Sequence, residues 1–246
     1  MKSMTDRGTA RRSRLQKGAT MVEFALVMPV AILLVLGIIQ MGLMYSAKEM
    51  LNEATFQGAR AGSLHHADVD SIKKAMARAM VPFYQDNTTS DDLERVAVAT
   101  IKALADFQCD DPTKPCSLKI EILNPTPEVF ADFGVTSNQS QGHTYIPNDN
   151  LEIRPHDVKG PTSGVSIQDA NTLKIRVTYG YPLAVPLMRQ MFGAIMCGAK
   201  SGIDAFGVQS LTPATSDDCR DFYSQGRVPL VAYATVQMQT PAWKPD

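Results

Sequence analysis

One stretch of the sequence decides the architecture: residues 18–47, GATMVEFALVMPVAILLVLGIIQMGLMYSA. From Phe24 to Ala47 it contains no charged residue. As a helix rising ~1.5 Å per residue, this part is about 36 Å long, more than the ~20 residues that cross a bilayer. A buried helix of a soluble protein is the alternative, but such a helix rarely has this length without a charge. The stretch therefore predicts a membrane-spanning helix over residues 24–47.

Charges on either side of this helix predict its orientation. Residues 1–18 hold six basic side chains and one acidic side chain, a net charge of +5. The rest of the chain has the other 18 basic and 24 acidic residues, a net charge of −6. By the positive-inside rule the leader stays in the cytoplasm, and the chain after Lys48 is exported. An acidic exported part argues against a nucleic-acid partner, because phosphate binding needs a basic surface.

The apolar segment is too long for an ordinary secretory signal, whose apolar core has about 7–15 residues. No Ala-x-Ala cleavage site follows it at Tyr45–Leu51. We therefore expect the segment to remain as an anchor in the lipid bilayer.

A carboxylate, Glu23, stands at the front edge of the span. A charge at the bilayer centre costs about 2.5–3.5 kcal/mol, and even near the surface an apolar residue would anchor better. If the chain were cut after Gly18, Ala19 would carry a free ammonium one helical turn from Glu23, on the same face. A neighbouring subunit's ammonium could pair with Glu23 in lipid, where screening is weak. Cleavage after Gly18 together with the Glu23 carboxylate would then set the axial offset between neighbouring subunits.

This pattern of basic leader, glycine, four residues, glutamate and long apolar helix resembles the type III signal of type IV prepilins. The stretch from Gly18 to Pro29 resembles specifically the TadE family of pseudopilins, which belong to the tight-adherence (Tad) pilus systems of bacteria. Weaker similarity follows at residues 52–62 and 227–238. The family includes long members resembling TadG, so a TadE-like and a TadG-like role both stay open.

The resemblance also implies roles for single residues. A membrane-embedded prepilin peptidase would cut between Gly18 and Ala19. Glu23 and Phe24 would serve recognition and assembly, while the catalytic aspartates would belong to the peptidase. A long N-terminal helix packed against an antiparallel sheet, as in a pilin, is the fold that the resemblance implies.

The exported part is expected to be α+β, with short helices followed by a small antiparallel sheet. Helices are predicted over residues 69–80 and 91–107, the second with Leu93, Val96, Ile101 and Leu104 facing inward. Alternating apolar residues predict strands at 117–123, 172–179 and 230–238. Residues 124–164 and 196–227 are interpreted as loops. The chain then divides into a leader (1–18), an N-terminal helix (19–63) and a periplasmic domain (64–246).

Two further features each have two interpretations. Gly58 and Gly62 form a GxxxG pattern, which brings helices close together in lipid. Here it lies beyond the span, so close packing within the domain is favoured over contact with a neighbouring subunit. The apolar stretch of residues 179–192 is interpreted as core packing after a strand, with a partner or membrane-surface contact as the alternative.

The four cysteines allow three disulfide pairings. We favour the pairs that are near in sequence, Cys109–Cys116 and Cys197–Cys219, because each closes a segment containing Pro or Gly. Each bond would stabilise the domain by roughly 2–4 kcal/mol and would require an oxidising compartment such as the periplasm. Four unpaired thiols are the alternative.

No pattern of catalytic or metal-ligating residues stands out. His65 and His66 with Asp68 and Asp70 are interpreted as a solvated helix junction, with a metal site as the alternative. The sequence has no GxSxG, HExxH or Walker-type loop. We therefore expect neither an enzyme nor a protein with a cofactor, metal or small-molecule substrate.

The leading hypothesis is a pseudopilin-like structural subunit of Tad pilus assembly, cleaved after Gly18 and held in the bacterial inner membrane by a single pass. Its expected partners are a prepilin peptidase, other pilins or pseudopilins and the Tad inner-membrane assembly proteins, and it could also be found with the pilus itself. The alternative is an uncleaved, single-pass periplasmic scaffold of a pilus or secretion system. A membrane-anchored enzyme is a third hypothesis, and it would require a polar cleft with titratable groups in the exported domain.

Overall fold

The computed structural model describes residues 16–86, 91–107, 117–136, 142–185, 189 and 221–245. Its helices are α1 (Gln16–Leu64), α2 (Val69–Met80), η1 (Val81–Tyr84), α3 (Asp92–Phe107), α4 (Pro127–Phe133), α5 (Ile167–Ala170) and η4 (Tyr223–Gln225). Its strands are β1 (Leu118–Asn124), β2 (Val135–Thr136), β3 (Thr144–Ile146), β4 (Thr172–Pro182), β5 (Arg227–Gln237) and β6 (Ala242–Trp243). The fold is α+β, as the sequence predicted.

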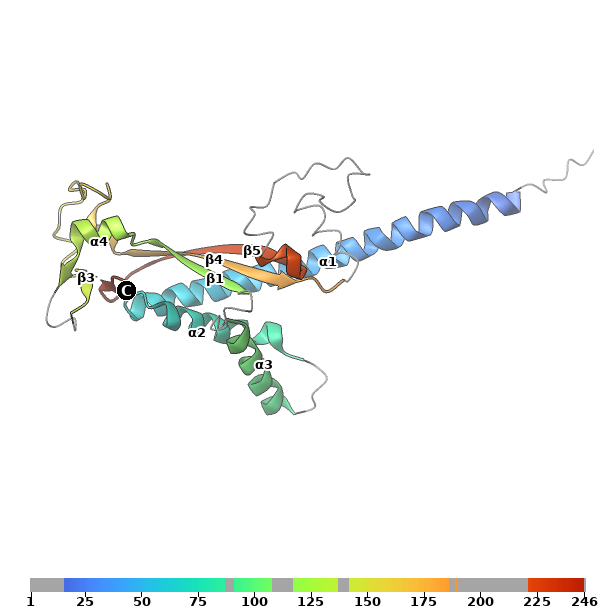
Figure 1. The fold of residues 1–246 in the computed structure, drawn as a ribbon, viewed down its shortest axis with the longest axis horizontal. Helices are drawn as coiled ribbons and strands as arrows, with labels where there is room; N and C mark the ends of the chain where they lie inside the picture. The colour runs from blue at the N-terminus through green and yellow to red at the C-terminus, as the bar shows by residue number, and fades with distance from the viewer. Residues whose placement is uncertain are drawn as a thin grey trace, which may run out of the picture.

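The helix α1 continues well past the apolar segment and joins it to the domain. Figure 1 shows its N-terminal part extending away from the other elements, while its C-terminal part lies along the sheet. In this C-terminal part Ala47, Leu51 and Ala54 are at most 1% exposed. Burial of a side chain such as that of Leu51 contributes about 1.5–3 kcal/mol. The same helix is therefore bare at one end and part of the core at the other.

The larger sheet has the order β1-β4-β5 and is antiparallel throughout. The predicted alternation along the central strand is confirmed, because Leu173, Ile175 and Val177 are fully buried while Lys174 is exposed. On β5 the small residues Ala232 and Ala234 are buried. Small side chains let a helix lie close to a sheet, and α1 packs against β5.

A second, smaller sheet of order β2-β3-β6 lies where α1 ends, far from the bare part of the helix (Figure 1). It joins residues 144–146 to the C-terminal residues 242–243. The interpretation of residues 124–164 as loop is therefore wrong for α4, β2 and β3. Strands of two or three residues have no detectable periodicity, and α4 begins with Pro127, a residue more often read as a loop signal although it suits the first turn of a helix.

The helix α2 has the predicted bounds and begins at an N-cap, Asp68, whose carboxylate accepts hydrogen bonds from the backbone N–H groups of Asp70 and Ser71. The predicted inward face of α3 is wrong. Leu93, Val96 and Ile101 are 80%, 43% and 67% exposed, and Leu104 is half-buried.

The buried face of α3 consists instead of Ala99, Ala103 and Phe107. These residues recur every four positions, so they form one stripe along the helix. Two of the three are alanines, and small side chains let α3 approach α2 and η1 closely. The small alanine side chains therefore face α2 and η1, and the larger side chains of Leu93, Val96 and Ile101 lie outside this contact.

The glycines Gly58 and Gly62 face α2 within the same chain. A Cβ atom on Gly62 would lie 2.8 Å from Cγ1 of Ile72, and a Cβ atom on Gly58 would lie 2.5 Å from Cγ of Met76. Both distances are shorter than van der Waals contact, so only glycine allows α1 and α2 to pack this closely. Close packing within the domain was the favoured interpretation of the GxxxG pattern, and it is confirmed.

Candidate functional site

The residues predicted to serve processing and assembly all lie on the first turns of α1. Gly18 and Ala19 are helical, and Glu23 follows Ala19 by four residues, so the two lie on one face of the helix. Glu23 is exposed, and Phe24 is 65% exposed. The helix thus presents a carboxylate and an aromatic ring side by side on its bare end, clear of the domain.

The apolar part of α1 has no fully buried residue from Met21 to Ile39, and all of these residues are exposed except Leu33, Leu36 and Gly37, which are partly covered. Its most hydrophobic 18-residue window has a mean hydropathy of 2.7, and none of it is buried against the domain. A core helix of a soluble protein would be covered on at least one side. The long apolar helix therefore fits a single-pass membrane anchor.

The bare part of α1 ends at a polar side chain. Gln40 is 1% exposed, and its Oε1 accepts a hydrogen bond of 3.0 Å from the backbone N–H of Val185. Two turns further on, the Lys48 ammonium donates a hydrogen bond to the carbonyl oxygen of Val231 in β5. Burial lowers the pKa of Lys48. Gln40 and Lys48 therefore mark where the domain is fastened to the helix.

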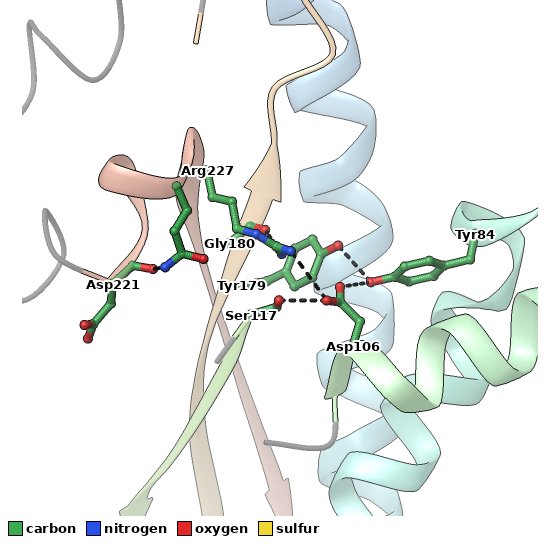
Figure 2. A network of polar contacts seen from close by, with 8 residues as sticks. Tyr84, Asp106, Ser117, Tyr179, Gly180, Asp221 and Arg227 are labelled. Carbon is green, nitrogen blue, oxygen red and sulfur yellow. Dashed lines mark hydrogen bonds and ion pairs between the residues drawn. The ribbon is translucent and has the colours of Figure 1, made fainter. Parts of the chain in front are cut away.

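A cluster of polar side chains ties five segments of the domain together (Figure 2). The carboxylate of Asp106, near the end of α3, accepts hydrogen bonds from the hydroxyls of Tyr84 (2.6 Å) and Ser117 (2.7 Å). The Tyr84 hydroxyl also lies 2.9 Å from that of Tyr179 on β4. The Arg227 guanidinium, from β5, lies 3.6 Å from Asp106. Helix α3 is thereby fixed to the sheet.

The environment of this cluster keeps its tyrosines neutral. Burial raises the pKa of Tyr179 to about 12, an effect that the hydrogen bond with Tyr84 partly offsets. Burial also raises the pKa of Tyr84, and its contacts with Tyr179 and Asp106 add to the shift. Because both carboxylate oxygens of Asp106 are engaged, the cluster is suited to holding elements together rather than to accepting a proton from a substrate.

No sequence pattern predicted this polar cluster. Its members are Tyr84, Asp106, Ser117, Tyr179 and Arg227, which are separated by up to 143 positions and share no motif. From the sequence, Tyr179 was placed only at the end of a predicted strand and the start of the apolar stretch 179–192. The register of β1 against β4, which pairs Leu118 with Tyr179, is what brings Ser117 close to Asp106 and Tyr179.

At the far end of α1, the His66 junction packs against the C-terminal segment. The ring of Trp243 is stacked between His66 (centroids 4.0 Å apart) and His143 (4.7 Å). Nδ1 of His66 lies 2.8 Å from the carbonyl oxygen of Pro241. The junction that we interpreted as solvated is thus packed on one side and borders a depression of about 550 Å³ on the other. Within the described ranges, no three His, Cys, Asp or Glu side chains are grouped so that they could hold a metal ion.

All four candidate disulfide residues, Cys109, Cys116, Cys197 and Cys219, lie outside the described residues. Their pairing stays a prediction.

Comparison with known proteins gives one match, and it falls on the candidate assembly segment. Residues 18–60 match the family described as TadE-like protein. No curated protein and no solved structure matches the chain. The matched residues begin at Gly18, include Glu23 and the whole bare helix, and end where α1 is packed in the domain. The TadE resemblance inferred from the sequence is therefore confirmed: the N-terminal segment of this protein, residues 18–60, is TadE-like.

Proposed function

We propose that this protein is a pseudopilin-like structural subunit of Tad pilus assembly, cleaved after Gly18 by a prepilin peptidase. Residues 1–18 are then a cytoplasmic leader, residues 19–63 the anchoring and assembly helix, and residues 64–246 a periplasmic domain. The inner membrane holds the chain, and other pilus proteins are its partners. TadE-like proteins are a structural, pilus-related family, so the proposal needs no catalytic site.

One observation carries the proposal. An exposed apolar helix of this protein is long enough to span a bilayer. The TadE-like match starts at Gly18 near the beginning of this helix, and the carboxylate of Glu23 follows five residues later. An anchor alone would not need Glu23, because a charge in lipid is unfavourable. In a subunit that packs beside its copies, the Glu23 carboxylate would pair with the Ala19 ammonium of a neighbouring subunit.

Cleavage is tested by the mass of the protein purified from its native membrane. Wild type should lack residues 1–18. Gly18→Leu should retain them, because a branched side chain replaces the hydrogen at the cleaved bond, while Gly8→Leu, a change within the leader, should be processed normally. Wild-type protein that keeps its leader would overturn the cleavage proposal and favour the uncleaved periplasmic scaffold.

The assembly role of Glu23 is tested separately. Glu23→Gln should be incorporated into the pilus apparatus at least ~10-fold less than wild type, because the amide cannot neutralise a neighbouring Ala19 ammonium in lipid, where a lost ion pair is worth more than ~1.4 kcal/mol. Glu49→Gln, at an exposed position on the same helix, is the matched control and should assemble normally. The measurement is co-purification with the other pilus components; equal incorporation of both variants would contradict the role of Glu23.

A further inference from the structure

The stretch of α1 from Gln40 to Ala47 has two different sides. On one side Gln40 and Ala47 are 1% exposed, covered by the domain. On the other side Met41, Leu43 and Tyr45 are 60%, 43% and 69% exposed. Hydrophobicity alone assigns this whole stretch to the membrane, yet the domain already lies beside it.

The element beside it is the end of β4 together with the residues that follow. Val185 donates its backbone N–H to Gln40, and Leu183 N–H lies 3.4 Å from the carbonyl oxygen of Gly226 at the start of β5. This end of the sheet presents Pro182 and Ala184, which are exposed and uncharged. In Figure 1 it lies at the point where α1 emerges from the domain.

Lengths decide where the bilayer surface falls. Measured from Phe24, the first residue after the charged Glu23, a hydrocarbon core of ~30 Å at ~1.5 Å per residue ends near Leu43. The headgroup layer of ~5–7 Å beyond the core then ends near Ala47. Both boundaries fall within residues 40–47, the stretch that the domain already covers on one side.

The chemistry of this end suits that layer. Gln40 would be a costly polar group in hydrocarbon, but its carbonyl is satisfied by Val185. Tyr45 and the exposed guanidinium of Arg189 lie near the same end, and amphipathic rings and arginines are favoured among headgroups. No charged side chain is found from Gln40 to Ala47 or among the described residues 181–185.

We propose that the end of the sheet at Pro182–Val185 is seated in the headgroup layer of the far leaflet, beside Gln40, so that the domain rests on phospholipid instead of standing clear of it. The inference depends on the anchoring role of α1 proposed above. It adds a second lipid contact, separate in sequence from the anchor by more than 130 residues. The position of the domain is then fixed by bilayer thickness as well as by the helix.

The test uses full-length protein in phosphatidylcholine vesicles, with Trp243→Phe as the background so that one introduced tryptophan reports alone. Three reporters are compared: Ile32→Trp on the bare helix, Ala184→Trp at the proposed contact, and Thr235→Trp at an exposed site about 26 Å along β5. The vesicles carry either a nitroxide on the headgroup or bromine deep in the acyl chains. Pro182→Trp is a second reporter of the contact, should Ala184→Trp disturb the fold.

Ile32→Trp should be quenched by the deep bromines. Ala184→Trp and Pro182→Trp should be quenched by the headgroup nitroxide at least ~2-fold more than Thr235→Trp, whose site is further away than the headgroup layer is thick. If Ala184→Trp and Pro182→Trp are quenched by the headgroup nitroxide no more than Thr235→Trp, while Ile32→Trp is quenched by the bromines, the proposed headgroup contact is wrong but the anchoring role of α1 is supported. If Ile32→Trp is not quenched either, the anchor and the seating are both overturned.

Discussion

Among single residues, Asp106 and Tyr179 show how one polar cluster can hold an α+β domain together. Asp106 is contacted from η1, from Ser117 just before β1, and from β5, and Tyr179 closes the cluster from the central strand (Figure 2). Buried polar groups of this kind stabilise a fold only when each has a partner, and removing one partner costs about 1–3 kcal/mol for each group left unsatisfied. The position of α3 therefore depends on the tyrosines of the cluster staying neutral.

The raised pKa of Tyr179 predicts a loss of stability in alkali. The folded protein keeps this phenol protonated up to pH about 12, whereas the unfolded chain releases the proton near ~10. The unfolded state then binds fewer protons between these values, so the free energy of unfolding falls as pH rises from 10 to 12, by roughly 2–3 kcal/mol. Tyr179→Phe should show a shallower decline over this range.

Urea unfolding of both proteins in detergent, followed by circular dichroism at several pH values, measures this difference. Tyr233→Phe is the matched control, because Tyr233 is 58% exposed on the neighbouring strand. Parallel declines for wild type and Tyr179→Phe would contradict the assignment of the alkaline transition to this residue.

At the scale of elements, the size of the side chains decides which face of a helix is buried against its neighbours. The face of α3 that carries Ala99 and Ala103 is buried, and the face with Leu93 and Ile101 is exposed. Hydrophobicity alone favours the larger residues for a core, because they bury more apolar area. The same logic applies to α1 and α2, where glycine at position 62 permits a contact that any larger residue would prevent.

This reversal on α3 predicts opposite results for two neighbouring substitutions. Ile101→Lys should change the stability of the domain by less than about 0.5 kcal/mol, because the side chain is 67% exposed. Ala103→Lys should destabilise it by roughly 3 kcal/mol or more, because a charge would enter a site that is 0% exposed.

The urea midpoint of the full-length chain in detergent distinguishes the two substitutions. Equal destabilisation by both would show that the exposed face of α3 is also packed in the protein. A loss of assembly without a change in midpoint for Ile101→Lys would instead identify that face as a contact with another subunit.

At the scale of the whole molecule, the packing of α3 beside the sheet places the end of α3 next to the start of β1. The hydrogen bond between Asp106 and Ser117 holds the residues on either side of segment 108–116 close to each other. Cys109 and Cys116, which lie within that segment and outside the described residues, are one of the two pairs favoured from the sequence, and their pairing stays a prediction.

The pairing prediction is tested by digesting the protein, purified from its native membrane, with trypsin without reduction. A single peptide covering residues 103–119 should be two hydrogens lighter than its reduced form. Reduction should lower the stability of the domain by roughly 2–4 kcal/mol for each bond that is broken. A peptide joining Cys109 or Cys116 to Cys197 or Cys219 would contradict the sequence-near pairing.

The sequence by itself determined the features that act locally. A long uncharged run of apolar residues favours a membrane over any other environment, so a span that begins at Phe24 could be predicted from the sequence, as could the position of Glu23 at its edge and the TadE resemblance. The bounds of α2 and the alternation of β4 also followed, because caps and periodicity are local signals. Only the tertiary structure decided which face of α3 is buried, where β2, β3 and β6 form, and that Asp106, Tyr84 and Tyr179 meet. It also decided that Gln40 is fastened to Val185, because hydrogen bonds and packing between distant segments depend on strand register and side-chain shape, which no local pattern specifies.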